Sequence, residues 1–173
     1  MSNFIRQSAE TLTFNPFQTI GKEWLLITAE KDGLVNTMTA SWGGVGILFG
    51  KPVAYIFVRP QRYTKEFIDS STHFSLSVLP EQYRKQLNYF GTVSGRTEDK
   101  IKNSNLSIER EDGVPYFSDA KLVMVCKKLF AQSVEESAFL DPSLIERWYK
   151  DKDFHTLYIA EIESILRKPE QSE

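Results

Sequence analysis

The sequence predicts a mainly β fold, a six-stranded antiparallel Greek-key barrel with peripheral helices. Short runs of apolar, β-branched and aromatic residues recur along the chain and are separated by turn residues, a pattern typical of antiparallel barrels. Few helical segments lie between these runs, so the βαβ alternation of a doubly wound parallel sheet is missing. No repeat, low-complexity tract or Pro/Ser-rich linker divides the chain. We therefore expect a single domain over residues 1–173.

Four strands are predicted in the first third of the chain. They cover residues 24–29, 34–42, 45–49 and 53–58. Asp32-Gly33 lies between the first two strands and favours a tight hairpin turn. The second strand is expected to end at the flexible pair Gly43-Gly44. Gly50-Lys51-Pro52 is expected to turn the chain into the fourth strand, which is rich in the residues that strands prefer.

The pattern changes in the middle of the chain. Residues 64–71 have the apolar spacing of a short amphipathic helix. Residues 73–79 alternate between apolar and polar side chains, which predicts a half-buried strand. Pro80 suits the first turn of a helix that continues through about Phe90, and Gly91 is placed to end it.

A turn-rich polar region, residues 92–119, follows this helix and contains a predicted strand near residues 106–109. The longest predicted strand comes next, over residues 121–134. Its apolar residues fall on both faces through Cys126, as in a strand that is covered on both sides or lies at a subunit contact.

Asp141-Pro142 combines an N-capping residue with a proline suited to the first helical position. The pair predicts a helix through about Tyr149. Residues 154–166 then form the last predicted strand.

Composition and charge argue against several classes of protein. Lys+Arg 21 against Asp+Glu 23 gives a formal net charge of −2, which argues against general nucleic-acid binding. A single cysteine excludes an internal disulfide framework, and with two histidines it makes a zinc site improbable, so no metal is expected. The N-terminus lacks a secretory signal pattern, and no window approaches the roughly 20 apolar residues of a membrane helix. We expect a cytoplasmic protein without membrane contact.

The first candidate site lies where a predicted strand ends before the helix at residues 64–71. Arg59 and Arg62 are three residues apart, and Thr64 could cap the helix or bond a phosphate oxygen. Two guanidinium groups beside the free amides of a helix start can hold an anion. The alternative is a surface turn whose arginines pair with acidic neighbours.

Two more segments could contact a ligand. Residues 36–44 combine small and hydroxylic side chains with Trp42 and two glycines, which could form a wall for a flat ring, or simply a strand that ends in a loop. Residues 91–96, with Asp99 and Lys100 after them, could complete an anion site or form an exposed loop. His155 could face a cleft as a hydrogen-bond donor, or it could be structural.

Taken together and in this order, these segments resemble the flavin reductase-like family, whose fold is an FMN-binding split barrel. The similarity is greatest to the flavoredoxins and to the reductase components of two-component flavin monooxygenases. It rests on NTMTASWGG at 36–44, RPQRYT at 59–64, YFGTVSGR at 89–96 with DK at 99–100, and FHTLYIAEI at 154–162. It spans a core of about residues 19–166. Ala160 is a mild departure, because relatives often have glycine there.

The resemblance implies a homodimer that holds one FMN per subunit near the subunit contact. The implied cofactor contacts are Asn36, Met38, Thr39, Ala40, Ser41, Trp42, Arg59, Arg62, Tyr63, Thr64, Ser94, Gly95 and Lys100. Residues 38–42 would line the ring, and Arg59, Arg62 and Thr64, helped by Lys100, would bind the phosphate. His155, the one catalytic candidate, would lie near the ring where nicotinamide stacks.

The function implied by this resemblance is that of an FMN-dependent oxidoreductase. It would be a flavin reductase that takes electrons from NAD(P)H and passes them to a flavin or to another small-molecule or protein acceptor. One alternative is a flavoredoxin-like electron-transfer protein without efficient NAD(P)H turnover. Another is a barrel-shaped binding module without redox function. The sequence does not choose between NADH and NADPH or identify the final acceptor.

Overall fold

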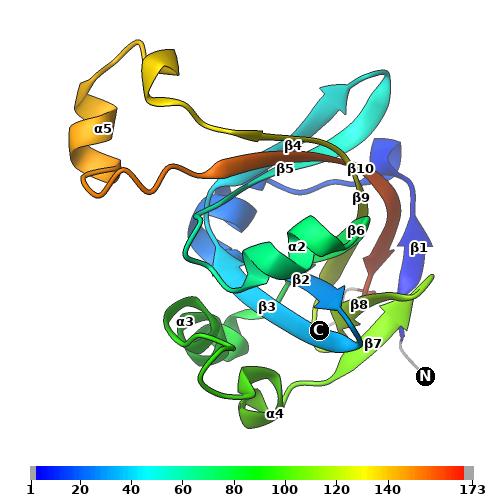
Figure 1. The fold of residues 1–173 in the computed structure, drawn as a ribbon. Helices are drawn as coiled ribbons and strands as arrows, with labels where there is room; N and C mark the ends of the chain where they lie inside the picture. Colours follow the sequence, from blue (N-terminus) through cyan, green and yellow to red (C-terminus); the bar gives the residue numbers. More distant parts are fainter. Residues whose placement is uncertain (1–2, 170–173) are drawn as a thin grey trace.

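The computed structural model describes residues 3–169. Its framework is a rolled, wholly antiparallel sheet with helices at its periphery (Figure 1), which confirms the predicted mainly β fold. Seven strands form the continuous run β3-β2-β6-β9-β10-β5-β4 and β1 pairs with β10, so this sheet has eight strands where six were predicted. The bounds are β1 Ile5–Gln7, β2 Leu25–Lys31, β3 Leu34–Ala40, β4 Gly43–Leu48, β5 Lys51–Val58, β6 His73–Val78, β9 Leu122–Ser133 and β10 Thr156–Arg167.

The remaining elements cover the edges and ends of this sheet (Figure 1). The helices are α1 Pro16–Gln18, α2 Thr64–Ser70, α3 Arg84–Thr92, α4 Lys100–Ser104 and α5 Ser143–Trp148. A π-helical turn spans Thr19–Glu23, and 3-10 turns span Ala9–Thr11, Glu81–Tyr83 and Glu136–Ala138. A separate hairpin consists of β7 Ile108–Glu111 and β8 Val114–Phe117.

Tight turns with positive φ angles join the hairpins. Asp32 and Gly33 (φ 51° and 77°) connect β2 to β3, which confirms the predicted turn. The next turn is shifted from the expected 50–52: Phe49 and Gly50 have positive φ, whereas Lys51 already pairs with Leu48. Likewise, Gly43-Gly44 opens β4 and does not form a loop. Two consecutive residues of positive φ match the right-handed twist of the strands that they join.

Two hydrophobic clusters lie on opposite sides of the sheet. One fills the barrel around Ile56, Phe74 and Tyr158, and the other packs Leu87 and Phe117 of α3 and β8 against the outside. Residues 122–126 of β9 are therefore buried on both faces within a single chain. The sequence left two explanations for the apolar residues on both faces, coverage on both sides or a subunit contact. For this half of the strand, coverage on both sides is the correct one.

The second cluster also corrects the prediction of a half-buried strand at 73–79. Ser75 and Ser77 are fully buried, because β8 covers the face on which they lie. Ser75 Oγ donates a hydrogen bond of 2.6 Å to the carbonyl oxygen of Pro115, and the Phe117 amide donates one of 3.4 Å to Ser77 Oγ. Both hydroxyls are thereby satisfied inside the protein.

Two further predictions change in the polar middle region. Gly91 lies inside α3, which ends one residue later at Thr92, so it does not cap the helix. The strand expected near 106–109 is β7, displaced to 108–111, and neither α4 nor β8 was predicted.

A long connection between β9 and β10, residues 134–155, projects from the barrel and carries α5 (Figure 1). We call it the arm. Its helix follows the predicted Asp141-Pro142 pair, and Asp141 Oδ1 accepts hydrogen bonds from the amide and the hydroxyl of Ser143.

Within residues 3–169, no helix has the length and apolar character needed to cross a membrane. The same range contains no group of three His, Cys, Asp or Glu side chains arranged to hold a metal ion.

Candidate functional site

A cavity of about 280 Å³ lies where β3 and β5 end, beside the start of β10. It brings together residues 38–42, Arg59, Arg62 and His155, all of which the sequence singled out. Phe57 and Trp148 complete its lining and were not predicted. We call this space the polar cavity, because it contains both arginines.

The other predicted residues lie behind this cavity. Asn36, Tyr63, Gly95 and Lys100 line a second cavity of about 490 Å³. Thr64 is buried and its Oγ1 accepts a hydrogen bond of 3.0 Å from Asn36 Nδ2. Ser94 lines neither cavity, and its Oγ accepts a hydrogen bond from the amide of Arg96.

Gly95 fits between β3 and α2 because it lacks a side chain. A Cβ atom at this position would lie 2.3 Å from Asn36 Oδ1 and 3.2 Å from Tyr63 Cδ1. The backbone of the 93–99 loop therefore rests directly on Asn36, the residue that bonds Thr64. This close approach makes glycine necessary at position 95.

Aromatic rings form one wall of the polar cavity. The ring of Trp42 lies 5.1 Å from the ring of Trp148, nearly perpendicular to it, and 5.1 Å from the imidazole of His155. Phe57 meets His155 edge to face at 6.2 Å. These rings offer apolar faces and edges against which a ligand ring can pack.

His155 is buried within this wall and is only 6% exposed. Its Nδ1 lies 2.7 Å from the hydroxyl of Tyr149. The pKa of His155 is lowered to about 4; burial is the largest cause, the positive charge of Arg59 adds to it, and Asp153 opposes it. The imidazole is therefore neutral at pH 7 and provides polarity without charge.

Arg59 connects the end of β5 to the arm. Its guanidinium pairs with the carboxylate of Asp153 at 2.7 Å and donates to the carbonyl oxygen of Trp148 at 2.9 Å. It also stacks over the ring of Tyr149, 5.0 Å from the centroid. Arg59 therefore fits the alternative interpretation, in which the arginines pair with acidic neighbours.

Arg62 has a different environment, which it shares with Lys100. Arg62 Nη1 donates to the carbonyl oxygen of Gly91 at 2.8 Å, and Lys100 Nζ donates to those of Phe90 and Val93 at 3.1 and 3.0 Å. All three carbonyls are at or just beyond the C-terminal end of α3, where the helix dipole is negative. Neither cation forms an ion pair with a carboxylate of residues 3–169.

These two cations are also desolvated. Lys100 is 3% exposed, and burial, with a smaller contribution from the charge of Arg62, lowers its pKa to about 8. Burial likewise lowers the pKa of Arg62. A buried and a partly buried cation that donate hydrogen bonds only to neutral oxygens leave an excess of positive charge, and an anion would compensate it.

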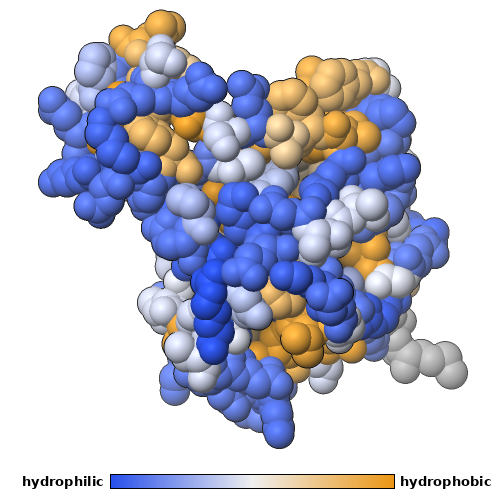
Figure 2. Space-filling model, in the orientation of Figure 1, coloured by the Kyte–Doolittle hydropathy of each residue, from blue (hydrophilic) through white to orange (hydrophobic). Residues whose placement is uncertain are grey.

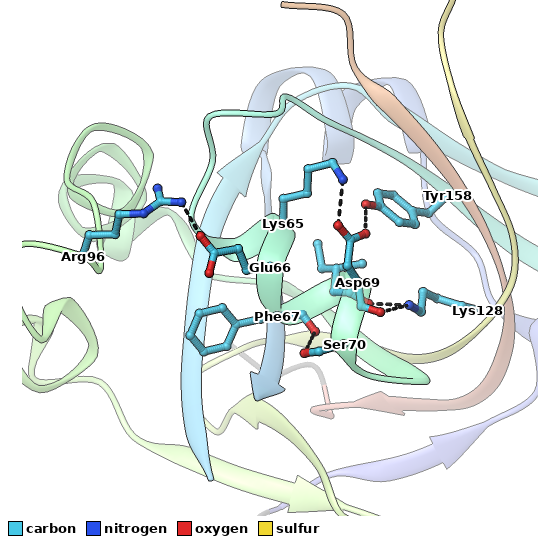
Figure 3. A network of polar contacts seen from close by, with 9 residues as sticks. Lys65, Glu66, Phe67, Asp69, Ser70, Arg96, Lys128 and Tyr158 are labelled. Atoms are coloured by element: carbon cyan, nitrogen blue, oxygen red, sulfur yellow. Dashed lines mark hydrogen bonds and ion pairs between the residues drawn. The ribbon is translucent and has the colours of Figure 1, made fainter. Parts of the chain in front are cut away.

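Helix α2, which begins at Thr64, is held on both sides (Figure 3). On one side, Arg96 pairs with Glu66 and stacks over Tyr63 at 4.6 Å. On the other, Asp69 accepts hydrogen bonds from Lys65, at 2.7 Å, and from the buried hydroxyl of Tyr158.

Lys128 of β9 adds hydrogen bonds to the carbonyl oxygens of Ile68 and Asp69 (Figure 3). Burial is the largest cause of the raised pKa of Tyr158, and its hydrogen bond to Asp69 adds to it. Only the four-residue spacing of Lys65 and Asp69 is visible in the sequence; the contacts with Tyr158 and Lys128 depend on the fold.

A larger cavity of about 630 Å³ lies beneath the arm, and we call it the apolar cavity. It shares Ser41, Trp42, Phe57 and Trp148 with the polar cavity. Sequence reasoning did not predict this cavity. The available signal was the group of aromatic residues within the polar arm, Phe139, Trp148, Tyr149 and Phe154.

Comparison with known proteins assigns the chain to a family. Residues 17–173 match the family model described as a flavin reductase like domain. An uncharacterized protein of Aeropyrum pernix is 29% identical over 99 residues, and the match covers 56% of this chain but only 37% of that relative.

Two solved structures share the fold. An FMN-binding domain of a flavin reductases-like enzyme from Shewanella baltica OS155 superposes with a TM-score of 0.71 at 18% identity, covering 96% of this chain and 78% of the other. The flavoredoxin of Desulfovibrio vulgaris (Miyazaki F) gives a TM-score of 0.66 at 22% identity, with the same coverage.

Proposed function

The chain belongs to the flavin reductase-like family, and from this premise we propose that it is an FMN-binding oxidoreductase that takes electrons from NAD(P)H and passes them to a flavin or another acceptor. Residues of both required kinds are present, because cations are available for a phosphate and aromatic side chains for a ring. When bound, FMN supplies the hydride and electron chemistry, and the protein positions and tunes it.

The observation that carries this proposal is the pair of unpaired cations formed by the partly buried Arg62 and the buried Lys100. Both donate only to carbonyl oxygens of residues 90–93, and Arg62 also lines the polar cavity. The FMN phosphate is an anion of the kind that this excess of positive charge favours. The aromatic wall around Trp42 lines the same cavity, and the isoalloxazine ring would contact it there.

The predicted residues receive distinct roles in this proposal. Residues 38–42 line the ring, and Arg62, Thr64 and Lys100 bind the phosphate. Asn36, Tyr63, Ser94 and Gly95 shape the passage behind it, where Asn36 bonds Thr64. Arg59 lines the polar cavity but acts mainly by holding the arm at its mouth through Asp153.

His155 would serve the ring without adding charge. Its imidazole is neutral at pH 7 and lies against Trp42. A neutral imidazole offers one donor and one acceptor. It would therefore hydrogen-bond a flavin or a nicotinamide without placing a charge next to the ring.

We also propose that two copies of the chain associate through the outer face of β9, β10 and β5. Phe130, Ile159 and Tyr55 are cross-strand neighbours and so lie on the same face of these strands. Phe130 and Tyr55 are 39% and 37% exposed. Figure 2 shows more apolar surface over the neighbouring β4–β5 hairpin, where Ile47 is 77% exposed.

One observation favours the flavoredoxin-like alternative. The apolar cavity beside the polar one is lined by no charged side chain of residues 3–169. Nothing in its lining would pair with the phosphates of a nicotinamide dinucleotide. An FMN electron carrier reduced by a protein partner would not need such a pairing.

Anaerobic spectroscopy separates these functions. FMN is added to the purified protein, and the flavin absorbance is followed after addition of NADH or NADPH. Bleaching within seconds supports the reductase. Bound flavin that resists both nucleotides but is bleached by dithionite supports the electron carrier. Absence of bound flavin contradicts both.

The phosphate assignment is tested with Arg62→Met and Lys100→Met. A charge-assisted hydrogen bond contributes about 1.5–3 kcal/mol, so each variant should bind FMN at least about tenfold more weakly. Affinity for riboflavin, which lacks the phosphate, should stay close to that of the wild type. Lys85→Met, at an exposed position of α3 that lines neither cavity, is the matched control and should bind FMN normally. Equal losses for FMN and riboflavin would contradict the assignment.

A further inference from the structure

We propose that the apolar cavity beneath the arm binds an uncharged, ring-bearing small molecule that carries a carbonyl or hydroxyl group. The cavity volume of about 630 Å³ lies within the range of small-molecule sites in proteins. A role for this molecule as electron acceptor or donor rests on the proposed function; its binding does not.

Three parts of the chain enclose the cavity. Phe17 and Ile20 contribute from α1 and the π-helical turn, Val45 from β4, and Leu144 and Trp148 from α5 in the arm. These residues are far apart in the sequence and converge on one space. A site built from several elements around an apolar interior is the usual form of a small-molecule pocket.

The charge of the lining selects the class of ligand. No Asp, Glu, Lys, Arg or His side chain among the described residues lines the cavity. Arg59 is tied to Asp153 and to the carbonyl oxygen of Trp148. An anion that enters the cavity would lose water without gaining a partner, so an uncharged molecule is favoured.

Two hydroxyl groups give the cavity its few polar points. The side chains of Ser41 and Tyr55 line it and form no hydrogen bond with any residue of the described chain. The third hydroxyl, that of Tyr149, is already bonded to His155.

The phenol of Tyr55 lies across Gly44, where a Cβ atom would come within 2.2 Å of its oxygen. A carbonyl or hydroxyl group on the ligand would pair with Tyr55 or Ser41, while its ring contacts Trp42 and Phe57.

The position of the cavity connects it to the proposed flavin site. Trp42 and Phe57 line both cavities, as do Ser41 and Trp148. A molecule in the apolar cavity would therefore lie next to a ring held in the polar cavity. This is the arrangement that two redox partners in direct contact require.

Calorimetric titration with two related compounds tests the inference. The probes are 2-acetylnaphthalene, an uncharged aromatic ketone, and 6-acetyl-2-naphthoate, the same ketone with a carboxylate. We expect the neutral ketone to bind at least about tenfold more tightly, because the carboxylate finds no partner. Equal binding of both probes, or no binding of either, would overturn the inference. No variant is needed for this comparison.

A pair of arm variants places the site. Leu144→Glu puts a charge into the lining and should weaken binding of 2-acetylnaphthalene at least about tenfold. Leu140→Glu changes a fully exposed residue of the same arm outside the cavity and should leave binding unchanged. Equal effects of the two variants would overturn the placement.

The titrations are run with and without FMN. Binding of the ketone in a protein that takes up no FMN would support the site and contradict the proposed function. Absence of ketone binding in a protein that takes up FMN would contradict the site and leave the proposed function supported. In a third outcome, the wild type binds no ketone and Leu144→Glu converts a dimer into single chains. The cavity would then be covered by a second copy of the chain, and the inference would be overturned.

Discussion

Gly95 shows how one missing methyl group shapes the candidate site. A Cβ atom there would overlap Asn36 Oδ1 at 2.3 Å, whereas one at Gly46 would have no neighbour within 4 Å. We expect Gly95→Ala to lower the free energy of unfolding by about 1–3 kcal/mol, the usual cost of overpacking. Gly46→Ala should change it by less than about 0.5 kcal/mol. Denaturant titration of both variants measures the difference, and equal effects would contradict the close approach.

Lys100 gives the protein a characteristic dependence on pH. Without added FMN, its pKa of about 8 lies below the 10.5 of a free lysine. The unfolded chain therefore binds more protons than the folded chain between these values, and the free energy of unfolding should rise from about pH 8 to about pH 10.5. Lys100→Met should remove this rise, and Lys102→Met should retain it. Denaturant titrations at several pH values provide the measurement.

The same lysine should couple FMN binding to protons. A bound phosphate stabilises the ammonium form, so FMN affinity should be highest below about pH 8 and fall above it. Riboflavin affinity should show no such fall. A parallel decline for both ligands would contradict the role of Lys100 at the phosphate.

Arg59 and Arg62 mark the limit of what a sequence reveals about single side chains. Both line one cavity, and their role as a phosphate clamp stays a prediction. Arg59 forms an ion pair with Asp153, which is 94 residues away in sequence. Arg62 instead donates to a carbonyl oxygen at the end of α3. No local pattern contains these partners, because tertiary contacts supply them.

At the scale of elements, α2 is positioned by a hydrogen bond across the barrel wall. Tyr158 of β10 donates to Asp69 near the end of this helix (Figure 3). Tyr158→Phe should lower the free energy of unfolding by about 1.5–3 kcal/mol, as expected for a hydrogen bond to a charged group. Tyr89→Phe is the matched control, because the Tyr89 hydroxyl bonds Glu98 at the surface. Its loss should be clearly smaller, and equal losses would contradict the positioning role.

Elements with a strong periodic pattern were predicted well. The strands at 121–134 and 154–166 and the Asp32-Gly33 hairpin lie within two residues of their observed bounds. β8 was missed because it has four residues and contains Pro115, which weakens the strand signal. α4 was missed because its five residues follow a polar loop and give no amphipathic period.

At the scale of the whole molecule, the outer face of β9, β10 and β5 should bring two chains together. We expect light scattering to give twice the 19.9 kDa of one chain. Phe130→Glu places a charge on this face and should yield a single chain. Leu34→Glu, at an exposed position on β3, should leave the mass unchanged. A wild-type mass of one chain would contradict the proposed dimer.

The arm leaves and re-enters the barrel at adjacent points, because Ser133 at its start pairs with Thr156 at its end. The pairing of β9 with β10 continues from there to Leu122 and Arg167 without any residue of the arm. An insertion, a deletion or a graft between residues 134 and 155 would therefore leave the strand register intact. If the arm lines a ligand site as proposed, ligand choice and barrel stability could change separately in evolution, and a library confined to the arm would be a direct way to redesign this protein for new molecules.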